Sequence, residues 1–122
     1  HLSAHPLRGP LFENWAMTEL LKARLHHGLR PDLHFLRDKE GHEVDALIET
    51  EPRKGHVIEI KSGGTVASDF FDGLDFWRQQ LPGHRFQPWL IYGGDTRQAR
   101  ERGTALPWSD LGALLEALAP TR

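Results

Sequence analysis

The sequence predicts an α/β fold, a three-layer arrangement in which helices flank a mixed central sheet in the order α-β-β-β-α-β-α. Three observations support it. Residues 10–27 repeat apolar side chains with the period of a helix. Residues 43–50 and 56–61 alternate apolar and charged side chains around a tight polar connection, as two paired strands do. Residues 88–92 form a buried-strand pattern, and a helix over 69–81 joins them to the preceding strand, which predicts a parallel crossover.

The first helix is predicted from its ends and its period. Pro10 suits the first position of a helix, where a missing backbone N–H costs no hydrogen bond. Gly28 follows the last turn and provides the stop. The residues that follow the period are Phe12, Trp15, Ala16, Glu19, Leu20 and Ala23, and Leu21 and Leu25 widen the stripe.

The strands begin with a short one at residues 33–37, followed by a turn at 38–41. The next two strands are joined by residues 51–55, which are rich in turn formers, so we expect an antiparallel hairpin. The aliphatic side chains of this hairpin share one face and predict its core side: Val44, Ala46, Ile48, Ile58 and Ile60.

The opposite face of the hairpin carries charge. Alternation places Asp45 on this face of the first strand, and Glu59 and Lys61 on the same face of the second. A connection centred near Arg53 sets Asp45 opposite Lys61, with Glu59 as a diagonal neighbour about 7–8 Å away between backbones. The same face also carries Glu43, Leu47 and Val57. We therefore expect two carboxylates and an ammonium group to converge on a partly covered surface.

After the hairpin the chain alternates between helix and strand. The helix over 69–81 carries Phe70, Phe71, Leu74 and Trp77 inward. Gly73 in its middle weakens that helix by roughly 1 kcal/mol relative to Ala. Residues 96–103 contain three arginines and are interpreted as an exposed loop or a short edge element. Residues 107–118 are predicted to form the last helix.

Composition restricts the class of protein. The chain has 122 residues, of which 39% are hydrophobic and 26% charged, as in a single globular domain. Neither an apolar run of about 18 residues nor a signal-peptide pattern occurs, so we expect no association with a membrane. The absence of Cys excludes disulfides, thiolate nucleophiles and Cys-based zinc sites, and it fits a cytoplasmic setting. The net charge of −2 means that any binding of nucleic acid must depend on a local basic patch.

Asp45, a gap, and then Glu59-Ile60-Lys61 follow the residue order of the PD-(D/E)XK superfamily, whose members have a restriction-endonuclease-like fold. Three longer segments, in order, extend this resemblance: GPLFENWAMTELLKAR, FLRDKEGHEVDALIE and HVIEIKSG. Over roughly residues 9–80 the chain resembles the uncharacterised domain that often lies C-terminal to an AAA+ ATPase module in bacteria and archaea, domain of unknown function 4143.

The resemblance implies a restriction-endonuclease-like, three-layer core that spans residues 1–122 as one domain. It also implies an ATPase module in the same chain, of which this sequence, lacking an initiator Met, would be a C-terminal fragment. DNA is the expected partner, and a homo-oligomer is compatible with this fold.

The charged face and the resemblance together assign roles to individual residues. Asp45 and Glu59 are the predicted ligands of Mg²⁺ or Mn²⁺, with the backbone carbonyl of Ile60 as a third. Lys61 would orient or deprotonate the attacking water, or hold a phosphate oxygen. Glu13 matches a helical acid that several members of the superfamily place beside the metal, so the resemblance makes it an auxiliary ligand. This set predicts a metal-dependent deoxyribonuclease, either an endonuclease or an exonuclease.

Each assignment has a structural alternative. Asp45 and Lys61 can form an ordinary cross-strand ion pair, worth under about 1 kcal/mol. Glu13 in the first helical turn can serve only to interact with the helix dipole. Crowded carboxylates can be relieved by a divalent cation or by a raised carboxylate pKa, and both outcomes stay open.

Two further functions stay open for the whole domain. It can be a non-catalytic module that recognises DNA or a protein for the attached ATPase, or a structural, oligomerising domain. The arginines of residues 96–103, together with Arg78 and Arg85, can form a phosphate-contacting patch or a solvated surface.

Overall fold

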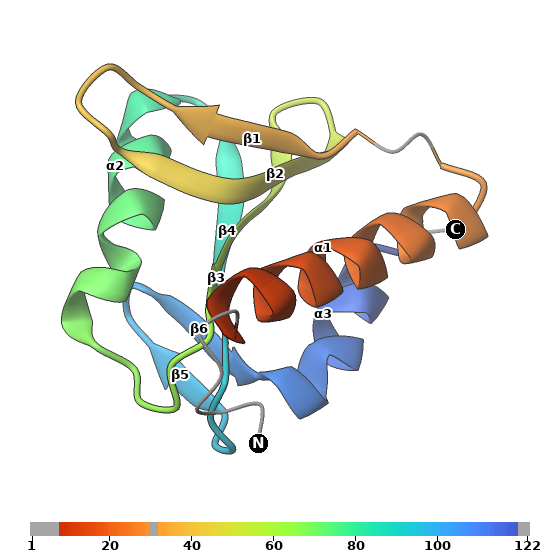
Figure 1. Ribbon diagram of the computed structural model, residues 1–122. Coiled ribbons are helices and arrows are strands. Elements are labelled where there is room, and N and C mark those ends of the chain that lie inside the picture. The colour runs from red at the N-terminus through yellow and green to blue at the C-terminus, as the bar shows by residue number, and fades with distance from the viewer. Residues whose placement is uncertain (1–7, 30–31, 120–122) are drawn as a thin grey trace.

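The computed structural model describes residues 8–29 and 32–119 of the chain. Its helices and strands are α1 (Arg8–His26), β1 (His34–Arg37), β2 (Glu43–Glu51), β3 (Lys54–Lys61), α2 (Asp72–Gln80), β4 (Arg85–Tyr92), β5 (Gln98–Arg100), β6 (Gly103–Pro107) and α3 (Leu111–Ala117) (Figure 1). Short 3₁₀ helices, Ser68–Phe71 and Trp108–Asp110, lead into α2 and α3.

Within the described residues, the strands form one six-stranded sheet in the order β1-β2-β3-β4-β6-β5. The central pairs β3–β4 and β4–β6 are parallel, and the outer pairs are antiparallel. The chain passes from β3 to β4 through α2, which is the crossover that the sequence predicts. The predicted mixed sheet is therefore confirmed.

Helices cover both faces of this sheet, which gives the three predicted layers (Figure 1). On one face, Ala16 and Leu20 of α1 and Leu114 of α3 pack against aliphatic side chains of the strands. On the other face, Leu74 of α2 packs with Phe71 and a second set of strand residues. Both faces are buried because the central strands carry apolar residues on each side.

The first helix ends as its sequence predicts. The N–H of Gly28 donates to the carbonyl of Leu25 at 3.0 Å, and the N–H of Leu29 donates to the carbonyl of Arg24 at 2.9 Å. Gly28 has φ of 71°, a left-handed conformation that closes a Schellman motif. The buried stripe of α1 is narrower than predicted, since Trp15, Leu21 and Leu25 are exposed.

The register of the β2–β3 hairpin differs from the predicted one. Ala46 lies opposite Ile58 and Leu47 opposite Val57, which displaces the expected pairing by two residues. One residue of this displacement comes from the turn, which is centred between Pro52 and Arg53 because Glu51 lies opposite Lys54. An irregularity between Glu49 and Glu51 adds the second residue. The prediction that Asp45 lies opposite Lys61 is therefore wrong.

The C-terminal third contains strands that periodicity did not predict. Gly103–Pro107 pairs with β4 as β6, and Gln98–Arg100 forms the short edge strand β5 that residues 96–103 allowed. The α-helical part of the predicted helix over 107–118 begins only at Leu111, because β6 continues to Pro107 and a 3₁₀ turn follows. Strand β4 begins at Arg85, earlier than the predicted segment 88–92. In the described part of the chain, no helix is long and apolar enough to cross a membrane.

Candidate functional site

The site begins where β2 and β3 stop pairing. The pairing of β2 with β3 runs from the turn back to Ala46, and the residues of β2 before Ala46 have no partner on β3. Asp45 directly precedes Ala46. Its side chain turns toward β3, and its Oδ2 accepts a hydrogen bond from the N–H of Ile60 at 2.7 Å. A carboxylate thus occupies the gap between two separating strands.

The backbone of β2 twists at this point. Val44 packs in the core beside α2, whereas Ala46 packs in the core beside α1 and α3. Regular alternation would place both side chains on one face, as the sequence predicts, and for Val44 that prediction is wrong. The twist leaves Asp45 between the two faces, where residues from either layer can reach it.

Glu59 extends from β3 toward α2 and is only 5% exposed. Burial, the hydrogen bond with Asp45 and the charge of Asp45 raise the pKa of Glu59 from 4.5 to about 10. The charge of Lys61 and the N–H of Ile60 act in the opposite direction on this pKa. With no cation bound, this shift favours the protonated form of Glu59 at neutral pH.

Glu13 approaches Asp45 from α1. Partial burial raises the pKa of Glu13, and the charge of Asp45 and a hydrogen bond with it raise that pKa further. Asp45 thus contacts both Glu13 and Glu59. Within the described residues, no choice of one oxygen from each of the three brings all three within 4.8 Å of one another. Asp45 is the centre of the cluster and the other two carboxyls flank it.

Lys61 is half-buried at the end of β3. Its charge lowers the pKa of both Glu13 and Glu59, so it acts on the same group of carboxyls. Its Nζ lies 5.8 Å from the centre of the Phe70 ring. No ion pair joins Lys61 to Asp45 in the described part of the chain, because the register does not place them opposite each other. The simple cross-strand ion pair is excluded.

Ile60 contributes its backbone. In an extended strand the N–H and C=O of one residue point to the same side. Because the N–H of Ile60 points to Asp45, its carbonyl faces the same gap between β2 and β3. The five residues that the sequence singles out, Glu13, Asp45, Glu59, Ile60 and Lys61, therefore lie around one place, and we refer to them as the Asp45 cluster.

The turn between β1 and β2 holds a second group of potential ligands. Asp38, Glu40 and His42 offer atoms that all lie within 4.8 Å of one another. The Asp38 carboxylate accepts hydrogen bonds from the N–H of Glu40 at 3.0 Å and of His42 at 2.8 Å. The His42 ring stacks on Phe76 at 3.8 Å between centroids. These contacts explain the group as an ordered turn.

The arginines for which the sequence leaves open a phosphate-contacting patch or a solvated surface have different surroundings in the structure. Arg102 donates to Asp72 at 2.8 Å and to Asp75 at 2.6 Å, and so it fastens the β5–β6 turn to α2. Arg100 donates to Gln98 on the same edge strand. Arg78 and Arg85 line a hollow together with Lys54. The sequence did not identify this hollow, because Lys54 and Arg85 become neighbours only through the parallel pairing of β3 with β4, which are far apart in the chain.

Comparison with known proteins places the chain in a family. No curated protein and no solved structure matches the chain. Residues 8–111 match the family described as Domain of unknown function (DUF4143). The match includes the whole Asp45 cluster and extends beyond the segment over which the sequence predicted the resemblance. Because it covers most of the chain, the protein belongs to the family Domain of unknown function (DUF4143).

Proposed function

We propose that this domain is a divalent-metal-dependent nuclease of the PD-(D/E)XK superfamily that hydrolyses DNA phosphodiesters at the Asp45 cluster. The observation that carries the proposal is the position of Asp45 between the carboxyls of Glu13 and Glu59, with the charge of Lys61 acting on both. Three acids and a lysine drawn from α1, β2 and β3 in this order also support membership of the superfamily.

The donor set suits Mg²⁺ or Mn²⁺. Both ions prefer carboxylate and carbonyl oxygens, which Asp45, Glu59 and Ile60 supply. Glu59 is buried beside Asp45 and, within the described residues, no lysine or arginine pairs with it directly. A cation would relieve the repulsion that otherwise keeps a proton on Glu59. Glu13 would act as an auxiliary ligand or accept a hydrogen bond from bound water.

The residues of the cluster have distinct roles in this proposal. A bound divalent ion supplies charge neutralisation and lowers the pKa of a water molecule. Asp45, fixed by the Ile60 N–H, holds its carboxylate in one orientation. Lys61 orients the attacking water or takes its proton, and its ammonium group can instead bind a phosphate oxygen. Burial of Glu59 limits the access of bulk water to one side of the site.

Cleavage assays test this function. Single-stranded, duplex and branched DNA are incubated with the protein and Mn²⁺ or Mg²⁺. We expect cleavage that EDTA abolishes and that Asp45→Asn, Glu59→Gln and Lys61→Ala each reduce at least a hundredfold, in the range of lost general acid–base catalysis. Glu116→Gln, an exposed acid on α3, is the matched control and should retain activity. Cleavage that persists unchanged in Asp45→Asn and Lys61→Ala would rule out the assignment.

A second candidate is a non-catalytic module that recognises DNA or a protein for an AAA+ ATPase in the same chain. The raised pKa of Glu59 favours it, because a carboxyl that keeps its proton leaves a hydrogen-bonded acid cluster that needs no cation. This function predicts binding to DNA or to the ATPase without turnover and without sensitivity to EDTA. The assays above, with binding measured in parallel, separate the two candidates.

A further inference from the structure

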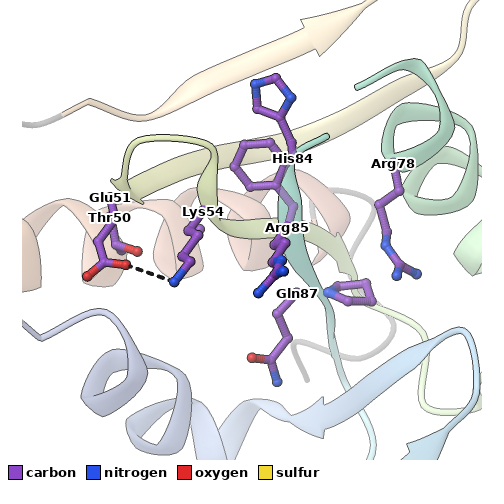
Figure 2. Close-up of a pocket in the computed structure, with 10 residues that line it drawn as sticks. Thr50, Glu51, Lys54, Arg78, His84, Arg85 and Gln87 are labelled. Carbon is purple, nitrogen blue, oxygen red and sulfur yellow. Dashed lines mark ion pairs between the residues drawn. The ribbon is translucent and has the colours of Figure 1, made fainter. Parts of the chain in front are cut away.

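A hollow of about 650 Å³ lies at the end of the sheet where β3 and β4 begin. Figure 2 shows Lys54, Arg85 and Gln87 pointing the same way from these neighbouring strands, while Arg78 reaches the hollow from α2. Pockets for small ligands have volumes of roughly 300–1,000 Å³, so this one can hold a phosphorylated group of moderate size. Lys54 and Glu59 are five residues apart on β3, which separates the hollow from the Asp45 cluster by about 17 Å.

The charge of this hollow differs from that of the whole chain. Lys54, Arg78 and Arg85 line it, and Glu51 is its acidic residue. Glu51 pairs with Lys54 at 3.5 Å. The guanidinium groups of Arg78 and Arg85 make no ion pair or side-chain hydrogen bond within the described residues. A chain with a net charge of −2 thus keeps two uncompensated arginines at one concave surface.

Arg102 differs from Arg78 and Arg85 because acidic side chains bind its guanidinium group. Arg102 is held by Asp72, Asp75 and the carbonyl of Ser68. Within the described residues, no acidic side chain forms an ion pair with Arg78 or Arg85. The five N–H donors of each guanidinium group are therefore available to an external anion.

The edge of β4 opens the hollow from the side. Arg85–Pro88 pairs with β3, and β6 joins β4 only from Trp89 onward. The N–H of Arg85 donates to the carbonyl of Arg53 on the β3 side at 2.7 Å, so by alternation the N–H of Phe86 points away from β3. Pro88, which has no N–H, suits an open edge. A ligand can therefore approach this end of β4 without displacing a strand.

We propose that this hollow binds a phosphate group, with Arg78 and Arg85 as its main contacts and Lys54 and Gln87 as additional donors. Guanidinium groups bind phosphate through paired, charge-assisted hydrogen bonds. Three cationic side chains around one hollow suit a phosphate group of charge near −2 better than they suit a single carboxylate ligand. The phosphate belongs to a nucleic-acid backbone or to a free phosphorylated molecule. The site goes beyond the proposed hydrolysis and stands whether or not the Asp45 cluster is catalytic.

Binding is measured first with inorganic phosphate, by calorimetry and by NMR of the arginine side chains. We expect Arg78→Gln and Arg85→Gln each to weaken binding by about tenfold, the usual effect of losing a charge-assisted hydrogen bond. Arg100→Gln on β5 removes the same charge from a side chain that does not line the hollow and should change the affinity less than about twofold. Asp45→Asn should leave this binding unchanged, so a failed cleavage assay and a failed phosphate site are distinguishable.

A 5′-phosphorylated single-stranded oligonucleotide identifies the source of the phosphate. If a nucleic-acid backbone is the ligand, the oligonucleotide binds more tightly than inorganic phosphate, and each Arg→Gln change lowers the slope of log K against log salt by about 0.7. If a free phosphorylated molecule is the ligand, the two probes bind with similar affinity and both depend on Arg78 and Arg85. Either result supports the site.

Unfolding of a variant weakens binding but does not tighten it, so Glu51→Gln tests the site in the opposite direction. Removal of this acid releases Lys54 from its 3.5 Å ion pair and should tighten phosphate binding about two- to fivefold. The proposal is overturned if inorganic phosphate and the oligonucleotide both fail to bind, or if folded Arg78→Gln and Arg85→Gln bind as wild type does. It is also overturned if Arg100→Gln weakens binding as much as they do.

Discussion

The Oδ2 atom of Asp45 accepts a hydrogen bond from the backbone N–H of Ile60 at 2.7 Å, so a side chain of β2 takes the place of a carbonyl in the β2–β3 ladder. This contact fixes a carboxylate at the point where two strands separate. Glu59 and Glu13 lie on either side of it, and their raised pKa values follow from that position.

Asp45→Ala should destabilise the fold more than Asp45→Asn. Alanine leaves the Ile60 N–H without an acceptor in a half-buried gap, which costs about 1–3 kcal/mol. Asparagine retains an oxygen acceptor for the Ile60 N–H. Urea denaturation of the metal-free proteins measures the difference, which we expect to exceed about 1 kcal/mol. Equal stability of the two variants would show that the hydrogen bond contributes little.

Without divalent cations, the protein should lose stability as the pH rises. The folded-state pKa of Glu59 is about 10 against an ordinary value of 4.5, so between these values the folded chain binds more protons than the unfolded chain. Stability from this group is therefore complete below pH 4.5 and decreases as the pH rises through the window, by at most about 1.4 kcal/mol per pH unit. Denaturation at pH 6 to 9 should show the slope, and Glu59→Gln should remove most of it.

Mg²⁺ or Mn²⁺ should reduce the same pH dependence. A cation at Asp45 and Glu59 favours the ionised carboxylates, and it stabilises the folded state by mass action. The measurement is the melting temperature against metal concentration at pH 8 for wild type, Asp45→Asn and the control Glu116→Gln. A metal-induced rise that is equal in all three proteins would place the ion elsewhere.

Gly73→Ala should destabilise the protein even though alanine favours helices. A Cβ at Gly73 would lie 2.1 Å from the carbonyl oxygen of Glu43 and 3.2 Å from Oε2 of Glu59. Helix propensity alone predicts a gain of about 1 kcal/mol, and we expect the clash to reverse it to a loss of at least 1–3 kcal/mol. Gly112→Ala in α3 is the control, because nothing lies within 4 Å of its Cβ, and it should stabilise the fold.

His56 should make the protein less stable in acid. Trp89 donates its Nε1–H to Nδ1 of His56 at 2.8 Å. Burial lowers the pKa of His56 below 6.5, and the hydrogen bond to the Ala117 carbonyl offsets part of that effect. The folded chain therefore binds fewer protons than the unfolded chain near and below pH 6.5, and this contribution is lost as the pH falls. His56→Asn keeps an acceptor for Trp89 and should flatten stability between pH 5 and 7, measured in a Glu59→Gln background to remove the opposing slope.

Most of the fold follows from local patterns. The helical period and Gly28 define α1, and the alternating charges define β2 and β3. The strands at 98–100 and 103–107 are different, since they are short and gain their identity from pairing with β4. Such segments have no periodicity that separates them from a loop.

The residues of the Asp45 cluster are likewise visible in the sequence, as an order of acids and a lysine. The arrangement of these residues in space does not follow from their order in the sequence. The position of the turn and an irregularity beside Glu51 together displace the hairpin register by two residues. A twist between Val44 and Ala46 turns Asp45 into the gap between strands. Gly73 reads in sequence as a weak helix position, and only the approach of α2 to Glu43 explains it.

The sequence by itself determined the α/β class, the order of its main elements and the identity of the candidate acids, because these depend on neighbours along the chain. The tertiary structure alone decided which carboxyl is buried, which arginines have acid partners and which line an open hollow. Burial and pKa depend on contacts between segments distant in sequence, and no local pattern encodes those distances.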